Sequence, residues 1–215
     1  TGKTVGILGL GRIGKEIASR AQAMKMRVLY HGRRRQPSEP HVYYDNLTDM
    51  ARDSDWLVII APGGKGANQA LAAARAGGEV RMVGCVGNDD FAASALALLR
   101  EAKMDLTFVR RVDGHTGTAL IVVDDAGENM ITVLPGANAR LSITALEGAG
   151  LDAGDWLLMQ LETPLEGILA SARFARHRGA KILLNLAPFM VFPAELLDEI
   201  DLLVVNETEL EGVLE

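Results

Sequence analysis

Near the start of the chain, a glycine-rich turn separates a strand-like run from a helix-like run. Residues 4–8 are mostly apolar and indicate a short buried strand, and apolar residues then recur at helical spacing over 17–24. Between them, Gly9 permits a tight turn, Gly11 lets the backbone approach a pyrophosphate, and Gly14 allows close packing of the helix on the strand. This context predicts a strand–turn–helix unit with a phosphate site at the helix N-terminus.

The segment after the next expected strand, 27–30, indicates which dinucleotide this unit would bind. An acidic residue there would hold the ribose 2′-hydroxyl of NAD, but the chain instead has Arg33, Arg34 and Arg35. Guanidinium groups pair well with phosphate oxygens, so the arginines favour the 2′-phosphate of NADP. The alternative is that at least one of the arginines lies in a solvated loop. The candidate cofactor-binding residues are Gly9, Gly11, Arg12, Ile13, Gly14, Arg33 and Arg34.

A second glycine-rich loop, at 62–70, runs directly into an alanine-rich stretch that predicts a helix over 67–76. Gly63 and Gly64 would let the backbone approach a ligand closely, and Lys65 would supply a polar contact. The expected helix start also offers free backbone N–H groups. A glycine-rich linker with one solvated lysine is an equally open interpretation of the composition.

Composition excludes several classes of protein. The chain has 215 residues, enough for one large domain or two small ones, and its net charge of -6 gives no sign of a nucleic-acid or membrane-surface partner. Cys85 is the sole cysteine, which excludes an internal disulfide and fits a reducing compartment. Because no apolar run approaches the roughly 18 residues of a membrane span, we expect a cytoplasmic protein.

Strand-like and helix-like segments alternate along the chain, which predicts an α/β fold with a doubly wound, mostly parallel sheet. After the second glycine loop, the expected strands are 80–83, 108–109, 156–159, 181–185 and 202–205, and the expected helices are 67–76, 92–102, 142–149, 165–178 and 194–199. Residues 118–124 and 129–134 indicate a β-hairpin. We expect one unit at 1–62 and another at 63–215, and because no polar linker joins them, the two could share a single continuous sheet.

The first segment resembles the nucleotide-binding domain of D-isomer-specific 2-hydroxyacid dehydrogenases, particularly the NADP-dependent glyoxylate and hydroxypyruvate reductases. The resemblance rests on 1–14, 30–35, 47–51 and 55–59, and it stops near residue 64. It implies NADP as the cofactor. The catalytic histidine of that family has no counterpart, because His115 and His177 lie in contexts that do not fit its pattern. Hydride transfer to a 2-keto acid would therefore lack its acid/base residue.

From residue 63 onward the chain is similar to ribokinase and other sugar kinases of the phosphofructokinase-B type. The matching motifs occur in family order at 63–70, 83–91, 116–123, 127–129, 135–138, 159–162 and 206–209. The resemblance implies sugar contacts from Gly63, Gly64, Lys65, Asn68 and Glu162. It also implies that Asn206 and Glu209 organise magnesium and the phosphate of ATP.

The residue types agree with those roles, but each has a structural alternative. Glu162 could be a surface residue at a strand end, Asn206 could cap a helix that begins at Glu207, and Glu209 could lie on a solvated face. Two family elements are absent from the sequence: the first strand with its sugar-binding aspartate, and the Gly-Ala-Gly-Asp motif that holds the catalytic base. Asp89, Asp90 and Asp155 do not follow the required glycine pattern.

Three functional hypotheses remain from the sequence. The first is a chimeric or truncated protein that binds NADP or a sugar without completing either reaction. The second is a ribokinase-like kinase with reduced activity, or with activity complemented by another chain, using ATP and magnesium. The third is a fold-recombination protein without a small-molecule function. Exposed sheet edges would also make homo-oligomers plausible.

Overall fold

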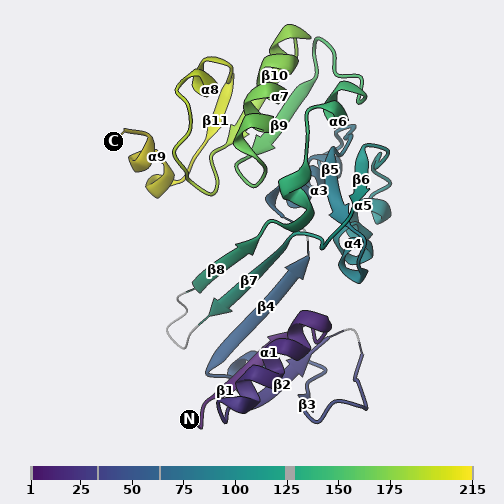
Figure 1. The fold of residues 1–215 in the computed structure, drawn as a ribbon, viewed down its shortest axis with the longest axis vertical. Coiled ribbons are helices and arrows are strands. Elements are labelled where there is room, and N and C mark those ends of the chain that lie inside the picture. Colours follow the sequence, from purple (N-terminus) through teal and green to yellow (C-terminus); the bar gives the residue numbers. More distant parts are fainter. Residues whose placement is uncertain (1, 33, 63, 124–128, 215) are drawn as a thin grey trace. The chain divides into compact units, whose positions relative to one another are not determined.

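The structure is a computed structural model that describes residues 2–32, 34–62, 64–123 and 129–214. Figure 1 shows helices and strands alternating along the chain, and most strand pairs are parallel, so the expected α/β class is confirmed. The chain divides into two compact units. The first comprises Thr1–Ala61 and Thr118–Leu134, and the second comprises Pro62–Gly117 and Pro135–Glu215.

The first unit is built on a six-stranded sheet with the order β3-β2-β1-β4-β7-β8. Its elements are β1 (Thr4–Leu8), α1 (Arg12–Ala23), β2 (Arg27–His31), β3 (Val42–Tyr43), α2 (Leu47–Arg52), β4 (Trp56–Pro62), β7 (Thr118–Val123) and β8 (Asn129–Leu134). The pairs β1 with β2, β1 with β4 and β2 with β3 are parallel. The β7–β8 pair is antiparallel, as the expected hairpin requires.

Apolar residues of β1 and β2 form the core of this sheet, because both strands are covered by helices. Ile7 and Leu29 are fully buried, and Met50 from α2 is buried with them. The hairpin β7–β8 extends the sheet beyond β4, so it groups with the first unit although its sequence lies between segments of the second. The contiguous division at residue 62 expected from the sequence therefore needs correction for the hairpin.

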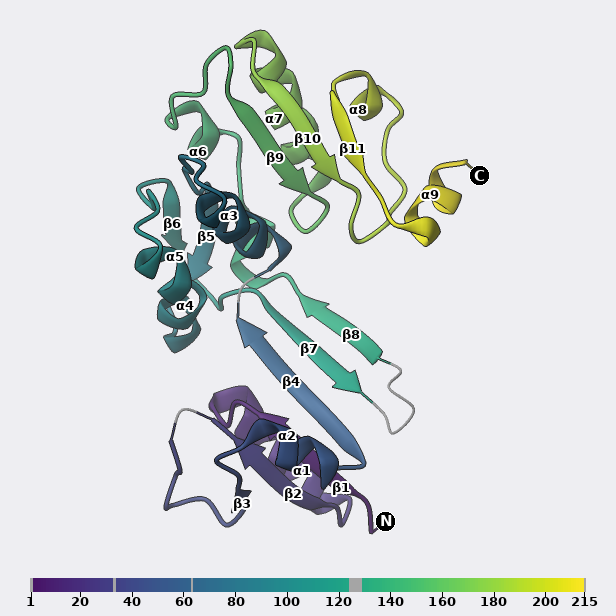
Figure 2. The same ribbon diagram turned by 180° about the vertical axis from the view of Figure 1, so that it is seen from behind.

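The second unit holds the remaining strands in two smaller sheets, β5-β6 and β11-β10-β9, and every pair in them is parallel. Its elements are α3 (Lys65–Arg75), β5 (Gly84–Gly87), α4 (Asp90–Ala95), α5 (Ala97–Glu101), β6 (Val109–Val112), the 3-10 helix η1 (Gly136–Arg140), α6 (Thr144–Glu147), β9 (Trp156–Gln160), α7 (Leu165–His177), β10 (Lys181–Asn185), α8 (Glu195–Asp198), β11 (Leu202–Val204) and α9 (Glu207–Leu214). Figure 2 shows these two sheets and their helices from the opposite side.

Two apolar cores hold the second unit together. In the larger one, side chains from β10, α7 and α8 pack together, and Ile182, Leu184 and Leu196 are fully buried. In the smaller one, Leu71 of α3 and Leu99 of α5 pack against β5. The larger core packs on the β11-β10-β9 sheet, and the smaller core packs on the β5-β6 sheet.

Four sequence expectations are wrong. The strand expected at 80–83 lies at 84–87, because the ladder with β6 pairs Gly84 with Val109, and only Arg81 makes an isolated bridge further back. The helix expected over 92–102 is two helices separated at Leu96, whose backbone has φ -98° and ψ -2°.

The third correction concerns sheet continuity. A single continuous sheet is not formed, because the described strands belong to three sheets. The helix after the second glycine loop also begins at Lys65, two residues before the expected start at Ala67.

Within the described residues, no helix has the length and apolar character needed to span a bilayer.

Candidate functional site

Lys65 and Glu162 meet at the start of α3. The backbone N–H of Lys65 donates a hydrogen bond to one Glu162 carboxylate oxygen at 2.8 Å, and its ammonium nitrogen lies 3.0 Å from the other. The Glu162 side chain is only 13% exposed, whereas that of Lys65 is 40% exposed. Two residues that are distant in sequence therefore form one charged pair, with the lysine on its solvent side.

The loop before α3 needs glycine at position 64 because the Glu162 carboxylate lies close to the backbone there. A Cβ built on Gly64 would lie 2.5 Å from a Glu162 carboxylate oxygen, so any side chain there would push the carboxylate away. A Cβ on Gly66 would lie 3.0 Å from the side-chain oxygen of Gln160. The glycines thus allow the amino end of α3 to sit directly against the end of β9. Gly63 lies outside the described residues.

Asn68 is the remaining sugar contact expected from the sequence. It lies one turn along α3 from Gly64, whose carbonyl accepts its backbone N–H at 3.3 Å. Its side chain is exposed. Lys65 and Glu162 are therefore brought into contact, while among the described residues the Asn68 side chain forms no hydrogen bond with either of them.

A cavity of about 660 Å³ opens beside the Lys65–Glu162 pair, within the second unit. Its polar end is lined by Glu162, Gln160, Asn138, Thr116 and Gly117. Of these five residues, only Glu162 was predicted from the sequence to contact a ligand. The signal for the other four was present, because they fall in the motifs at 116–123, 135–138 and 159–162 that carry the kinase resemblance.

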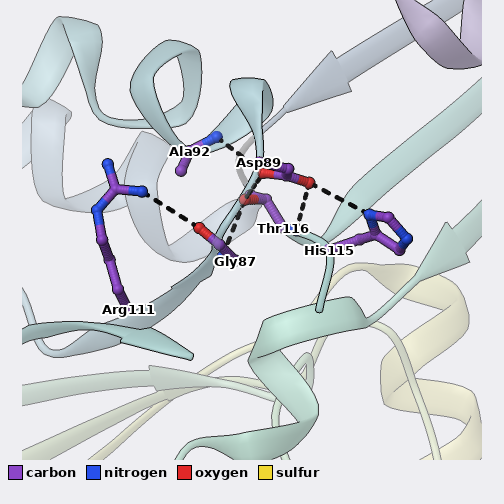
Figure 3. A network of polar contacts seen from close by, with 6 residues as sticks. All are labelled: Gly87, Asp89, Ala92, Arg111, His115 and Thr116. Atoms are coloured by element: carbon purple, nitrogen blue, oxygen red, sulfur yellow. Dashed lines mark hydrogen bonds and ion pairs between the residues drawn. The ribbon is translucent and has the colours of Figure 1, made fainter. Parts of the chain in front are cut away.

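A buried polar network fixes Thr116 at this end of the cavity (Figure 3). Asp89 accepts hydrogen bonds from the Thr116 backbone N–H at 2.9 Å, from its hydroxyl at 2.6 Å, and from the Ala92 N–H at 3.2 Å. The Thr116 hydroxyl in turn accepts the Gly87 N–H at 3.0 Å. The carboxylate therefore caps α4 and joins three segments of the chain.

The same network perturbs the acidity of Asp89. Burial raises the pKa of this carboxyl, but the hydrogen bonds from Thr116 and Ala92 and the nearby His115 outweigh burial and hold the pKa below its usual value. The His115 ring nitrogen lies 3.7 Å from the carboxylate. Asp89 is thus held ionised with both oxygens engaged, which suits a structural anchor better than a catalytic base.

Cys85 lies in β5 and borders the cavity. It is 6% exposed and therefore belongs to the buried core. Burial raises the pKa of its thiol, and the charge of Arg110 offsets this only in part. A buried thiol with a raised pKa is a poor nucleophile.

Asn206 and Glu209 form a reciprocal cap at the start of α9. The Glu209 backbone N–H donates to the Asn206 side-chain oxygen at 2.8 Å, and the Asn206 N–H donates to the Glu209 carboxylate at 2.8 Å. This is the capping role considered as the alternative for Asn206. No group of three or more His, Cys, Asp or Glu placed to hold a metal occurs in the described part of the chain, so the magnesium role of this pair stays a prediction.

In the first unit, the glycine turn between β1 and α1 has the conformation that its sequence predicts. Gly9 has a positive φ of 96°, and Gly11 precedes α1 without any side-chain cap. Gly14 is buried within the helix, and the exposed Arg34 lies in the loop after β2. The side chains of Arg12 and Ile13, and the whole of Arg33, lie outside the described residues.

Two family models match the chain, and they overlap. Residues 58–215 match the pfkB family carbohydrate kinase, and residues 1–76 match the NAD binding domain of D-isomer specific 2-hydroxyacid dehydrogenase. Both resemblances expected from the sequence are therefore confirmed. The overlap, residues 58–76, covers most of β4 and all of α3, where one strand–loop–helix unit satisfies both families.

The curated relatives are also sugar kinases. The chain is 42% identical over 155 residues to a ribokinase from Haemophilus influenzae, covering 71% of this chain and 51% of that protein. It is 36% identical over 155 residues to a Schizosaccharomyces pombe ribokinase, covering 68% and 48%. It therefore spans about half the length of the curated relatives it matches.

Among solved structures, the chain is similar to a Thermotoga maritima ribokinase with a TM-score of 0.64 and 27% identity. That match covers 98% of this chain and 62% of the other, so the structural similarity extends through both units. Together with the family model that matches 58–215, these findings show that the chain belongs to the pfkB family of carbohydrate kinases.

Proposed function

We propose that the second unit binds a sugar or a similar polyol at the Lys65–Glu162 end of the cavity. The observation that carries this proposal is the shielded Glu162 carboxylate, held in place by both donors of Lys65. Each carboxylate oxygen accepts one of these bonds and keeps further acceptor capacity for a hydroxyl group. Because the carboxylate is already oriented, a sugar hydroxyl would meet a preorganised acceptor.

The surrounding groups suit a ligand that carries several hydroxyls. Asn138 and Gln160 supply amide donors and acceptors at the same end of the cavity, and Thr116 is fixed there by Asp89. Ligand sites of this kind combine an apolar wall with a few convergent polar groups. The ribokinases to which this chain is similar make ribose the first sugar to test.

The proposal concerns binding. Phosphoryl transfer also needs a base near the acceptor hydroxyl and a neutralised phosphate. Asp89, a carboxylate near the cavity end, has both oxygens engaged by Thr116 and Ala92. Turnover of ribose with ATP and magnesium would support the alternative, a ribokinase-like kinase activity.

Calorimetric titration with ribose tests the binding proposal. Glu162→Gln should weaken binding roughly ten- to hundredfold, because a hydrogen bond to a charged group contributes about 1.5–3 kcal/mol. Glu166→Gln is the matched control, since Glu166 is exposed on α7 and does not line the cavity. Equal affinities for the two variants, or no ribose binding by the folded protein, would contradict the proposal.

A second candidate function is NADP(H) binding by the first unit. It is supported by the glycine turn, where Gly9 has a positive φ and Gly11 leaves the α1 N-terminus uncapped by a side chain. Backbone N–H groups there would face a pyrophosphate, and the exposed Arg34 would favour a 2′-phosphate.

Titration of NADPH fluorescence tests this second candidate. Gly11→Asp should abolish saturable binding, because a carboxylate would occupy the place of the phosphate. Arg34→Ala should weaken NADPH more than NADH, whereas Arg20→Ala, at an exposed arginine further along α1, should affect neither. Unchanged NADPH binding by Gly11→Asp would refute a site at this turn.

A further inference from the structure

Two strands of the second unit present open edges. β5 is paired only with β6 in its two-stranded sheet, and β9 is paired only with β10 at the end of its three-stranded sheet. These strands are fully described, and neither pairs with the other. In Figures 1 and 2 the arrows of β5 and β9 point in the same general direction. A strand has two hydrogen-bonding edges, so each of these strands has one edge without a ladder.

The cavity of about 660 Å³ lies against both open edges. Side chains alternate between the two faces of a strand, so a cavity on one face would touch every second residue. Here the lining residues are consecutive, from Val80 to Val86 along the β5 segment and from Gly154 to Gln160 along β9. An unbroken series of this kind means that the cavity faces the edges of the strands. We call this space the slot.

Helices of the second unit complete the walls of the slot. Ala67 and Ala70 of α3, Leu146 of α6, and Ile168 of α7 all line it. An occupant would therefore meet apolar side chains as well as the two strand edges. Strands buried in this way in parallel sheets are apolar on both faces.

Charge is confined to the ends of the slot. Glu79, Arg81 and Asp155 lie at the amino-terminal end of the flanking strands, and Glu162 lies beyond their carboxyl end. Between them the lining residues are uncharged, including Cys85 and those over 157–159. An occupant should therefore be uncharged along its middle, because an unpaired charge there would lose its hydration.

We propose that the slot accepts one extended segment of a second polypeptide as a parallel β-strand. The segment is apolar on both faces and about five residues long, since β9 has five residues at about 3.3 Å each. Its backbone pairs with β5 on one side and β9 on the other, which joins the two small sheets into one. Strand addition to an open edge is a known mode of peptide recognition.

A separate polypeptide is the favoured source, because the described strands of this chain already belong to sheets and none of them is free to enter the slot. The uncharged lining between the charged ends fits a segment of such a polypeptide that is apolar along its length. The proposal does not rest on sugar binding, although the carboxyl end of the added strand would lie beside Glu162 and Asn138.

Fluorescence anisotropy with a synthetic peptide tests the proposal. The probe has five alternating valine and isoleucine residues and a lysine-rich tail at its amino end for solubility. The control peptide has the same side chains but carries N-methyl groups on alternate amides, which removes donors to one edge. We expect saturable binding of the probe and roughly tenfold or weaker binding of the control, because the control cannot complete its ladder. No binding of the probe, or equal binding of the two peptides, would overturn the proposal.

Hydrogen–deuterium exchange locates the bound peptide on the unmodified protein. Peptide binding should slow exchange in β5 and β9 together, and protection of neither strand would overturn the proposal. Leu158→Lys places a charge in the slot and should abolish binding, whereas Leu98→Lys is the control because Leu98 is 52% exposed and does not line the slot.

Analytical ultracentrifugation without peptide distinguishes the source of the strand. A stable dimer in which β5 and β9 are already protected would overturn the assignment to a separate polypeptide and identify a second copy as the occupant. A ribose titration of the same sample separates the two proposals. Peptide binding without ribose binding would contradict only the sugar proposal, and the reverse result would contradict only the slot.

Discussion

The two units of the protein differ in how completely their strands are paired. In the first unit, six strands form one sheet, with no break from β3 to β8. In the second unit, five strands form two sheets, and a cavity lies between the open edges of β5 and β9. Both units contain short apolar strands, so strand-forming sequence is not what separates them. A continuous sheet therefore depends on having the right neighbouring strand as well as the right local sequence.

The largest effect is expected in the larger core of the second unit, where packing around β10 is compared with packing around β9 beside the slot. Leu184 lies in the central strand β10 and is fully buried, so Leu184→Ala should lower the free energy of unfolding by about 2–5 kcal/mol. Leu157→Ala should cost less, because Leu157 is half-buried and already borders the cavity. Urea denaturation measures both values. Equal losses of unfolding free energy would mean that β9 is packed as tightly as β10, which would contradict an open edge on β9.

A smaller effect is expected at the junction beside the cavity. A Cβ on Gly87 would lie 2.5 Å from backbone atoms of His115 and Thr116, which have little freedom to move. Gly87→Ala should therefore destabilise the protein by about 1–3 kcal/mol. In Gly64→Ala the clash is with the end of the Glu162 side chain, so stability should change less and ribose affinity more. A larger loss of stability for Gly64→Ala would contradict this assignment.

The pH dependence of stability sharpens the role of Asp89. Its pKa is lowered in the folded state, so its contribution to stability is complete above the unfolded pKa of about 3.9 and is lost as the pH falls through the folded pKa. Asp89→Asn should remove this part of the acid dependence. Asp90→Asn is the control, because Asp90 is exposed on the same helix. Thermal unfolding of the three proteins from about pH 7 to about pH 2 measures this dependence, and identical acid profiles would count against the anchor role.

The smallest effect is expected at the start of α9. Asn206→Ala removes the hydrogen bond from the Glu209 backbone N–H to the Asn206 side chain and should cost about 0.5–2 kcal/mol of helix stability, measured by amide exchange in α9. The same loss with and without magnesium is expected from a purely capping role. A loss that magnesium enlarges would favour the predicted metal role of Asn206 and Glu209.

Much of the fold was predictable because it is encoded locally. The expected strand over 181–185 coincides with β10, and the expected hairpin and the helix beginning at Leu165 were also found. In each case the periodicity of apolar residues agrees with the tertiary environment. The Gly9 turn was predictable for the same reason, since its positive φ requires glycine.

The failures occurred where distant neighbours decide the structure. The run 80–83 has higher strand propensity than Gly84–Gly87, but pairing with β6 and close contact with the 114–116 backbone select the latter. In the candidate site, the residue types of Lys65 and Glu162 were predictable, but their mutual contact was not. Thr116 was missed because its role depends on a hydrogen bond to Asp89, 27 residues earlier in the sequence.

Hydrogen–deuterium exchange of the free protein reports which strand edges are paired. We predict slow exchange throughout β10, which has partners on both sides, and fast exchange at alternate amides of β9, whose donors face the slot. Strands β1 and β2 of the first unit should match β10. Uniform protection of β9 and β5 in a monomeric, peptide-free protein would contradict the account, because it would mean that their edges are already paired.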